Sequence, residues 1–140
     1  MKLLVVALSL FIGSAYACSC GEWGSAREML STAKTAFVGT VASSRLGEIS
    51  SDSGDLLTLT NFSIVRSFKP RALRKMTTRS EVGDGANCGT SFVVGQSYLV
   101  FGYAFEGKIY TDLCSFQPMT GARSQINFLR DLDRASRLSL

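Results

Sequence analysis

Four cysteines constrain this chain more than any other feature of its sequence. Cys18 and Cys20 are separated by a single residue, whereas Cys88 and Cys114 lie far along the chain. A bond between the first two would close a cramped ring and is disfavoured by strain. Each remaining pairing ties the region of Cys18 to two distant points, and one bond closing about 70 residues contributes roughly 4 kcal/mol through chain entropy. The spacing leaves these two pairings open.

The N-terminal segment has the pattern of a secretion signal. A basic residue precedes an apolar run over residues 3–12, and the small residues Ala15 and Ala17 stand where a signal peptidase needs them. The run is too short to span a bilayer, and no later segment is long and apolar enough to do so. We expect a signal peptide over residues 1–17 and one mature domain over residues 18–140, exported to the extracellular space or, in a bacterium, to the periplasm.

Two other interpretations of this N-terminus stay open. The segment could be retained as an anchor, or it could be a lipoprotein signal that modifies Cys18. Lipoprotein signals usually carry leucine three residues before the cysteine, where this chain has Ala15 followed by the bulky Tyr16. An even number of cysteines in an exported chain indicates disulfides rather than a metal or redox pair.

The hydrophobic pattern predicts a mainly β domain. We expect strands over residues 37–46, 57–68, 74–82, 97–105 and 108–114. One helix is expected before them over 25–36, where Ser25 and Glu28 have the spacing of a capping box. A second is expected over 123–137, with Ile126, Leu129, Leu132 and Ala135 along one stripe. The short connections favour a small, closed barrel of five antiparallel strands with a helix before it and a helix after it, and the four cysteines add two disulfides.

Three local patterns sharpen this expectation. The apolar phase changes within 57–68, which predicts a β-bulge near Thr60 and Asn61. Glu106 and Gly107 fit a two-residue hairpin turn, and 97–105 is apolar on both faces, as a covered central strand is. Asn61 also begins a glycosylation acceptor pattern, although its place inside a strand favours a chance match.

The residue types argue against an enzyme. The chain has no histidine, which removes histidine-dependent triads and most catalytic zinc sites. It also lacks a phosphate-binding glycine loop and a recognisable pair of carboxylates, so we expect neither catalysis nor a cofactor.

The charge balance is mildly basic. The formal net charge is +4, and one unit of it would leave with the signal peptide. The densest basic stretch could contact extracellular polyanions, although a solvated loop and strand would look the same, and we expect no nucleic acid partner. This stretch comprises Lys69, Arg71, Arg74, Lys75 and Arg79.

The predicted cleavage gives Cys18 a particular chemistry. A cut after Ala17 would leave Cys18 with a free α-amino group beside its own carbonyl, and these two atoms can close a five-membered chelate ring on a metal ion. Bonds at Cys18 and Cys20 would hold this end rigid and lower the entropy lost on docking. The alternative is that the bonds only prevent fraying of a terminus.

Several short stretches, in the same order, resemble a known family over nearly all of the predicted mature chain. They are Cys18-Ser19-Cys20, Phe37-Val38-Gly39-Thr40, Cys88-Gly89, Gly95-Gln96-Ser97-Tyr98-Leu99-Val100 and Leu113-Cys114-Ser115-Phe116. Together they resemble the N-terminal domain of the tissue inhibitors of metalloproteinases and, more broadly, the netrin-like module. That family has a five-stranded OB-type barrel with flanking helices. The third disulfide usual in its inhibitory domain is missing here.

The resemblance implies an inhibitory mechanism as well as a fold. It implies the pairings Cys18–Cys88 and Cys20–Cys114, and it assigns the amine and carbonyl of Cys18 to the catalytic zinc of a target protease. Ser19 would enter the pocket of the protease just past the scissile position. Ala86, Asn87, Cys88 and Gly89 would form the adjoining contact ridge.

Two further functions remain as alternatives. The chain could be a non-inhibitory netrin-like module that recruits an extracellular partner through its barrel face or its basic stretch. A lipidated Cys18 would instead make the chain an anchored envelope domain.

Overall fold

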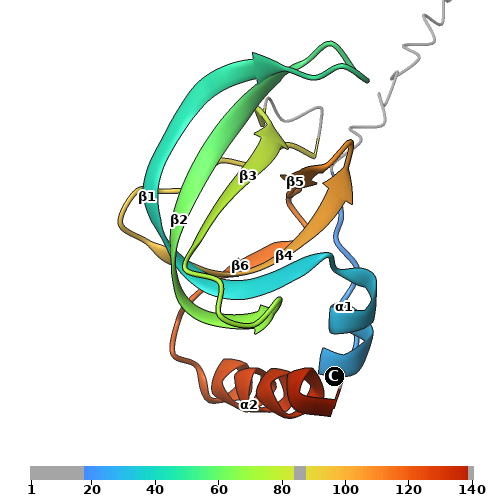
Figure 1. The fold of residues 1–140 in the computed structure, drawn as a ribbon, viewed down its shortest axis with the longest axis vertical. Helices are drawn as coiled ribbons and strands as arrows, with labels where there is room; N and C mark the ends of the chain where they lie inside the picture. Colours follow the sequence, from blue (N-terminus) through green and yellow to red (C-terminus); the bar gives the residue numbers. More distant parts are fainter. Residues whose placement is uncertain (1–17, 84–87, 139–140) are drawn as a thin grey trace, which may run out of the picture.

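The computed structural model describes residues 18–83 and 88–138. The predicted signal peptide and two expected ridge residues, Ala86 and Asn87, lie outside this part of the chain. Within it, no helix is long and apolar enough to cross a membrane. The elements, in order (Figure 1), are α1 (Ala26–Thr32), β1 (Thr35–Ile49), β2 (Leu56–Lys69), β3 (Lys75–Glu81), β4 (Ser97–Phe105), β5 (Lys108–Tyr110), β6 (Phe116–Pro118) and α2 (Arg123–Leu138).

Five of the strands close into a ring. β1 pairs with β2 and with β4, β2 pairs with β3, and β4 pairs with β5, all antiparallel. A single parallel pair, Arg79 with Tyr110, joins β3 to β5 and completes the ring. The expected OB-like arrangement with two helices and two disulfides is confirmed, except that this one pairing is parallel. β6, which the sequence did not predict, adds to β4 beside the ring.

The ring has apolar side chains on both faces of β1 and β4, as the pattern of 97–105 predicts. One cluster fills the ring, and its buried members are Phe37, Val41, Phe62, Phe92, Tyr98 and Val100. The other lies between the ring and the helices and consists of Ala26, Leu30, Ala33, Ala36, Val38, Phe68, Leu99, Phe101, Leu129 and Leu132. Figure 1 shows α2 across one end of the ring with α1 beside it. Phe105, at the end of β4, is 41% exposed.

The first helix is shorter than predicted. Ser25 and Glu28 form the expected capping box, but the helix ends at Thr32 and β1 begins at Thr35. Thr35 and Ala36 are fully buried and pair with Gly102 and Phe101 of β4. Burial against the neighbouring strand therefore outweighs the helical preference of the sequence here.

The predicted bulge at Thr60 and Asn61 is wrong. β2 pairs with β3 in unbroken register over this stretch, and Thr58 and Thr60 are buried on the same face as Phe62. The extra residue lies opposite, in β1, where Ala42 stands between the partners of Phe62 and Asn61. The alternation of apolar residues suggests a change of face because threonines, rather than apolar residues, occupy the buried positions 58 and 60 on the face that Phe62 shares.

Two details at the C-terminal end also differ from the prediction. The strand expected over 108–114 stops at Tyr110. In α2 the predicted stripe residue Ile126 is 48% exposed, and Gln125 is buried in its place beside Leu129 and Leu132. Gln125 Nε2 donates to the Pro118 carbonyl at 3.0 Å, and its Oε1 accepts from the Thr120 amide at 2.9 Å, so a hydrogen-bonded amide occupies a core position.

Candidate functional site

Two disulfides fix the segment that precedes α1. Cys18 bonds to Cys88 and Cys20 bonds to Cys114, with Cα atoms 5.6 and 5.2 Å apart. These are the pairings that the family resemblance implies, and they are confirmed. All four cysteines are paired in these two disulfides, so the site contains no free thiol.

The two partner cysteines belong to segments that contact each other. The amide of Leu113 donates to the Cys88 carbonyl at 3.1 Å. The amide of Cys114 donates to Asp112 Oδ1 at 2.9 Å, and the Phe101 amide of β4 donates to the Ser115 carbonyl at 2.7 Å. Both disulfides therefore attach residues 18–20 to one edge of the ring. In Figure 1 the blue segment before α1 runs along the side where β4 and β5 lie.

Trp23 provides a further anchor that sequence reasoning missed. Its indole N–H donates to the Cys114 carbonyl at 2.9 Å, and its ring meets Phe101 edge to face at 5.0 Å. It is the single tryptophan of the chain and stands three residues after Cys20. This position could have suggested an anchor, but its partner lies 91 residues away. The segment is thus held by side-chain packing as well as by sulfur.

The predicted contact residues within the described chain are accessible. Ser19, Cys20 and Cys88 are exposed, while Cys18 and Gly89 are partly buried. The structure therefore brings Cys18, Cys20, Cys88 and Gly89 together, with Ser19 exposed between the two disulfides.

Gly83 and Gly89 shape the edge of the ring that carries Cys88. A Cβ atom on Gly89 would lie 2.3 Å from the Glu81 carbonyl oxygen and 2.7 Å from the Gly83 nitrogen. The chain before residue 84 and the chain after residue 87 therefore pass within backbone contact of each other. The Thr90 amide donates to the same Glu81 carbonyl at 3.1 Å, so Cys88 is held against the end of β3.

Each disulfide borders a hollow in the surface. One, of about 370 Å³, is lined by Cys20, Gly21, Glu22, Trp23, Leu113, Cys114, Phe116 and Gln117. The other, of about 240 Å³, is lined by Glu81, Cys88, Tyr103, Tyr110, Thr111 and Asp112. In the second hollow the two tyrosine rings stack with centroids 6.0 Å apart. Burial, together with the nearby carboxylates of Asp112 and Glu81, raises the pKa of Tyr103, so this hollow favours a neutral phenol or a cation over an anion.

The donor set limits the metal chemistry of the site. Within residues 18–83 and 88–138, no group of three or more His, Cys, Asp or Glu side chains is placed to hold a metal ion.

The predicted basic stretch does not act as one surface. Lys69 Nζ donates to the carbonyls of Leu30 and Ala33 at 2.8 and 2.7 Å, at the end of α1. Arg79 Nε lies 2.8 Å from Glu48 Oε2, and the hydrogen bond from Arg79, together with a smaller effect of Lys108, lowers the pKa of Glu48 to about 2. The members that remain exposed, at and beside the turn from β2 to β3, are Arg71, Arg74 and Lys75.

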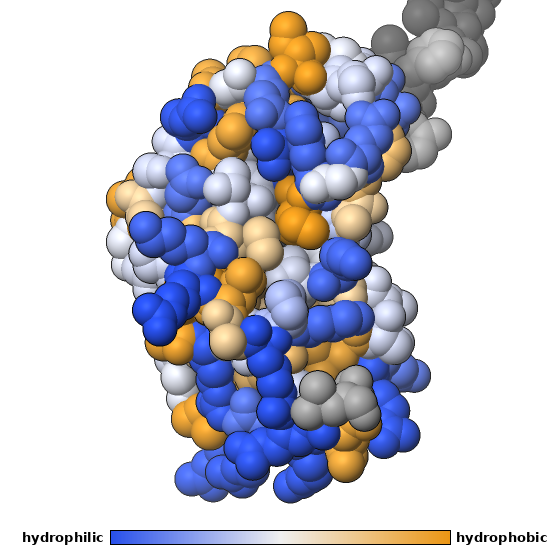
Figure 2. Space-filling view, in the orientation of Figure 1, coloured by the Kyte–Doolittle hydropathy of each residue, from blue (hydrophilic) through white to orange (hydrophobic). Residues whose placement is uncertain are grey.

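Apolar side chains do not form a large patch on the face shown in Figure 2. They are scattered among hydrophilic residues, which dominate the end covered by α2. Isolated exposed apolar residues are ordinary on a protein surface, so this face gives no reason to place the candidate site there.

The geometry defines a class of protein: a small, disulfide-bonded β domain whose N-terminal segment is fixed to one edge of a five-stranded ring. No protein-family model matches the chain, and a search of the curated proteins finds no match.

Proposed function

We propose that the mature chain is a secreted, netrin-like inhibitor of zinc metalloproteases that acts through the N-terminal amine and carbonyl of Cys18. The observation that carries the proposal is the double attachment of residues 18–20. Both disulfides reach the same edge of the ring and leave Ser19 exposed between them. A terminus fixed in this way can approach a partner with little further loss of entropy.

The chemistry requires an open position on the target metal. A catalytic zinc keeps one coordination position for water or substrate. The Cys18 amine and carbonyl would displace that water and close a five-membered ring on the zinc. Removal of residues 1–17 is essential, because the lone pair of an amide nitrogen within the chain is delocalised into the neighbouring carbonyl and does not bind the metal.

The surrounding residues would form the rest of the contact. Ser19 would enter the pocket just past the scissile position of the target, and Cys88 with Gly89 would form part of the adjoining ridge. Ala86 and Asn87, outside the described residues, complete that ridge in the proposal. The small Ser19 side chain favours proteases with shallow pockets, so Ser19→Gly should change the inhibition constants unequally across a panel.

One added residue tests the mechanism. The chain beginning at Cys18 is compared with a form that carries one alanine before it, in assays against a panel of zinc metalloproteases. We expect the extended form to lose inhibition at least 100-fold while its circular dichroism and its two disulfides stay unchanged. Equal inhibition by the two forms would refute chelation by the terminus. Intact mass of the exported protein separates a free Cys18 from a lipidated one.

Three exposed cations favour a second candidate, a non-inhibitory extracellular binding module. Arg71, Arg74 and Lys75 lie together at and beside the turn from β2 to β3 and could contact a polyanion. Binding to heparin that weakens with salt, with no inhibition of any protease in the panel, would favour this function over the first.

A further inference from the structure

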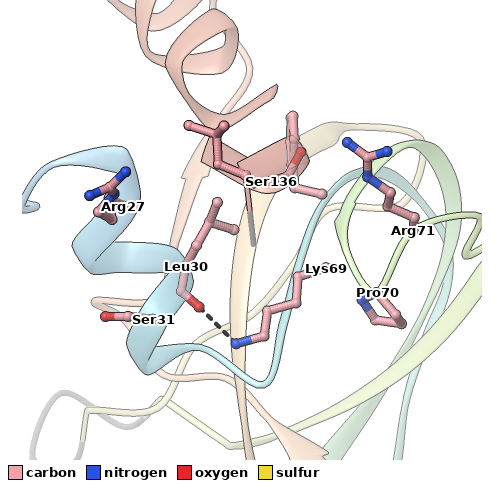
Figure 3. A pocket seen from close by; sticks show the side chains of 9 residues that line it. Arg27, Leu30, Ser31, Lys69, Pro70, Arg71 and Ser136 are labelled. Carbon is pink, nitrogen blue, oxygen red and sulfur yellow. Dashed lines mark hydrogen bonds between the residues drawn. The ribbon is translucent and has the colours of Figure 1, made fainter. Parts of the chain in front are cut away.

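A pocket of about 700 Å³ lies where α1, the turn after β2 and the end of α2 meet (Figure 3). Its volume is in the range of small-molecule sites. It is lined by Arg27, Leu30, Ser31, Phe68, Lys69, Pro70, Arg71, Ser136 and Leu138. None of these belongs to the proposed protease contact, so the two sites can be tested independently.

Among the described residues that line this pocket, the charged groups are all cationic. Arg27 comes from α1, whereas Lys69 and Arg71 come from the end of β2 and the turn that follows. No carboxylate is among the lining residues that the structure describes. Figure 3 shows the two arginines on opposite sides of the pocket. Across the described residues, neither arginine has an ion pair or a side-chain hydrogen bond. Their charges are therefore available to a ligand.

Lys69 contributes a cation that is fixed in place. Its ammonium group donates to the carbonyls of Leu30 and Ala33, which uses two of its three hydrogens. The third remains for a ligand atom. Because the chain itself positions this ammonium, a ligand would not have to order a flexible lysine.

The remaining lining is mainly apolar, and the turn that carries Pro70 and Arg71 has a fixed shape. Leu30 and Phe68 are buried at the base, while Pro70 and Leu138 are exposed. Ser67 Oγ donates to the Pro70 carbonyl, and Ala72 has a φ of 64°, a backbone conformation that residues other than glycine rarely adopt. The turn that carries Arg71 is therefore specified locally rather than by a ligand.

We propose that this pocket binds a small anionic amphiphile, such as a carboxylate with an aliphatic chain. The anionic head would lie among Arg27, Lys69 and Arg71, where guanidinium groups can make charge-assisted hydrogen bonds. The aliphatic part would cover Pro70 and Leu138. A neutral amphiphile would lack partners for the three cations, and a cationic one would be repelled.

Calorimetric titration with sodium decanoate, below its micelle concentration, tests the assignment. The pocket variant is Arg27→Gln/Arg71→Gln. The matched control is Arg45→Gln/Arg130→Gln, which removes the same charge from two exposed arginines outside the lining. We expect saturable binding of one decanoate, at least tenfold weaker binding to the pocket variant, and unchanged binding to the control. Decyltrimethylammonium should not bind.

Three results would overturn the proposal. They are the absence of saturable decanoate binding, equal weakening in both variants, and equal binding of decanol and decanoate. Equal weakening would show a response to net charge alone, and equal binding of the alcohol would show an apolar surface without a site for the head. Amide chemical shifts locate the ligand, since binding must move the signals of Ser136 and Leu138.

Discussion

Substituting Gly89 by alanine should break the edge that carries Cys88. The new Cβ would lie 2.3 Å from the Glu81 carbonyl oxygen and 2.7 Å from the Gly83 nitrogen, whereas real Cβ contacts stay beyond about 3.0 Å. Both obstacles are backbone atoms, so no side chain can rotate away. Overpacking costs typically 1–3 kcal/mol, and we expect about 3 kcal/mol here because two segments must separate.

Gly21 supplies a matched control, since it follows Cys20 as Gly89 follows Cys88. A Cβ atom there would meet nothing within 4 Å, so Gly21→Ala should be neutral or slightly stabilising through the unfolded chain. Urea unfolding of the two variants gives the comparison. For a slope of roughly 1.5–2 kcal/mol per M, the midpoint of Gly89→Ala should fall by about 1.5–2 M. Midpoints within about 0.3 M of each other would refute the close approach at Gly83.

Three more predictions follow from single contacts. Replacing Cys20 and Cys114 by alanine should cost about 3–4 kcal/mol in urea unfolding, because with the other bond intact this one closes a path of about 28 residues; a loss below 1 kcal/mol would contradict that path. Glu48→Gln should lower stability at pH 7 and much less at pH 2, because the pKa of Glu48 is held at about 2, chiefly by Arg79, and the contribution of its charge fades as pH falls from about 4.5; an equal loss of stability at both pH values would show that the Glu48 charge does not contribute. Ala72→Gly should raise the melting temperature, since glycine relieves a φ of 64° at a strain of roughly 1 kcal/mol, and a lower melting temperature would show that the turn is unstrained.

The sequence predicts the central strand best. The sequence predicts a strand over residues 97–105 that is covered on both faces. β4 has those bounds, and its residues 98–102 are buried, whereas residues 103–105 are exposed. The turn after it forms as predicted, with φ of 47° at Glu106 and 73° at Gly107. Composition and turn chemistry act within a few residues here, so a local pattern suffices.

Features set by partners were not predictable in the same way. Register is a property of two strands, so the apolar phase of β2 could not show that the extra residue lies at Ala42 in β1. β6 has three residues, too few for any periodicity. β1 continues to Ile49 through residues that are largely exposed, because pairing with β2 rather than burial sustains it.

In the candidate site, too, the local features were predictable from the sequence and the long-range contacts were not. Cysteine spacing identified the segment at Cys18 and left two pairings, between which the family resemblance chose. The anchoring role of Trp23 arises from its contact with Cys114, in a segment that the sequence places far from the first cysteines. The same holds for Lys69, which looked like a surface cation but serves the carbonyls at the end of α1. The residue type shows that Lys69 is positively charged, and only the tertiary structure shows which carbonyls its ammonium group binds.

The pH dependence of the proposed inhibition can distinguish an effect of the Cys18 amine from an effect of the fold. The chain contains no histidine, so no side chain of ordinary pKa titrates between about pH 5 and 8. The pKa of Glu48 lies far lower, at about 2, and the pKa of Tyr103 is raised further above that range. A free Cys18 amine, in contrast, titrates near pH 8 and must lose its proton to bind zinc.

Inhibition should therefore weaken as pH falls below 8, by up to about tenfold per unit, while the urea midpoint of the inhibitor stays constant between pH 5.5 and 8. A zinc-directed inhibitor without an amine, assayed on the same protease, corrects for groups of the target that titrate in this range. Inhibition that stays constant from pH 8 to 6 after this correction would exclude an amine ligand. Inhibition that falls together with the urea midpoint would instead show that the domain unfolds. Protonation of the Cys18 amine should change the affinity for the protease without changing the stability of the five-stranded ring, so the two quantities should not fall together.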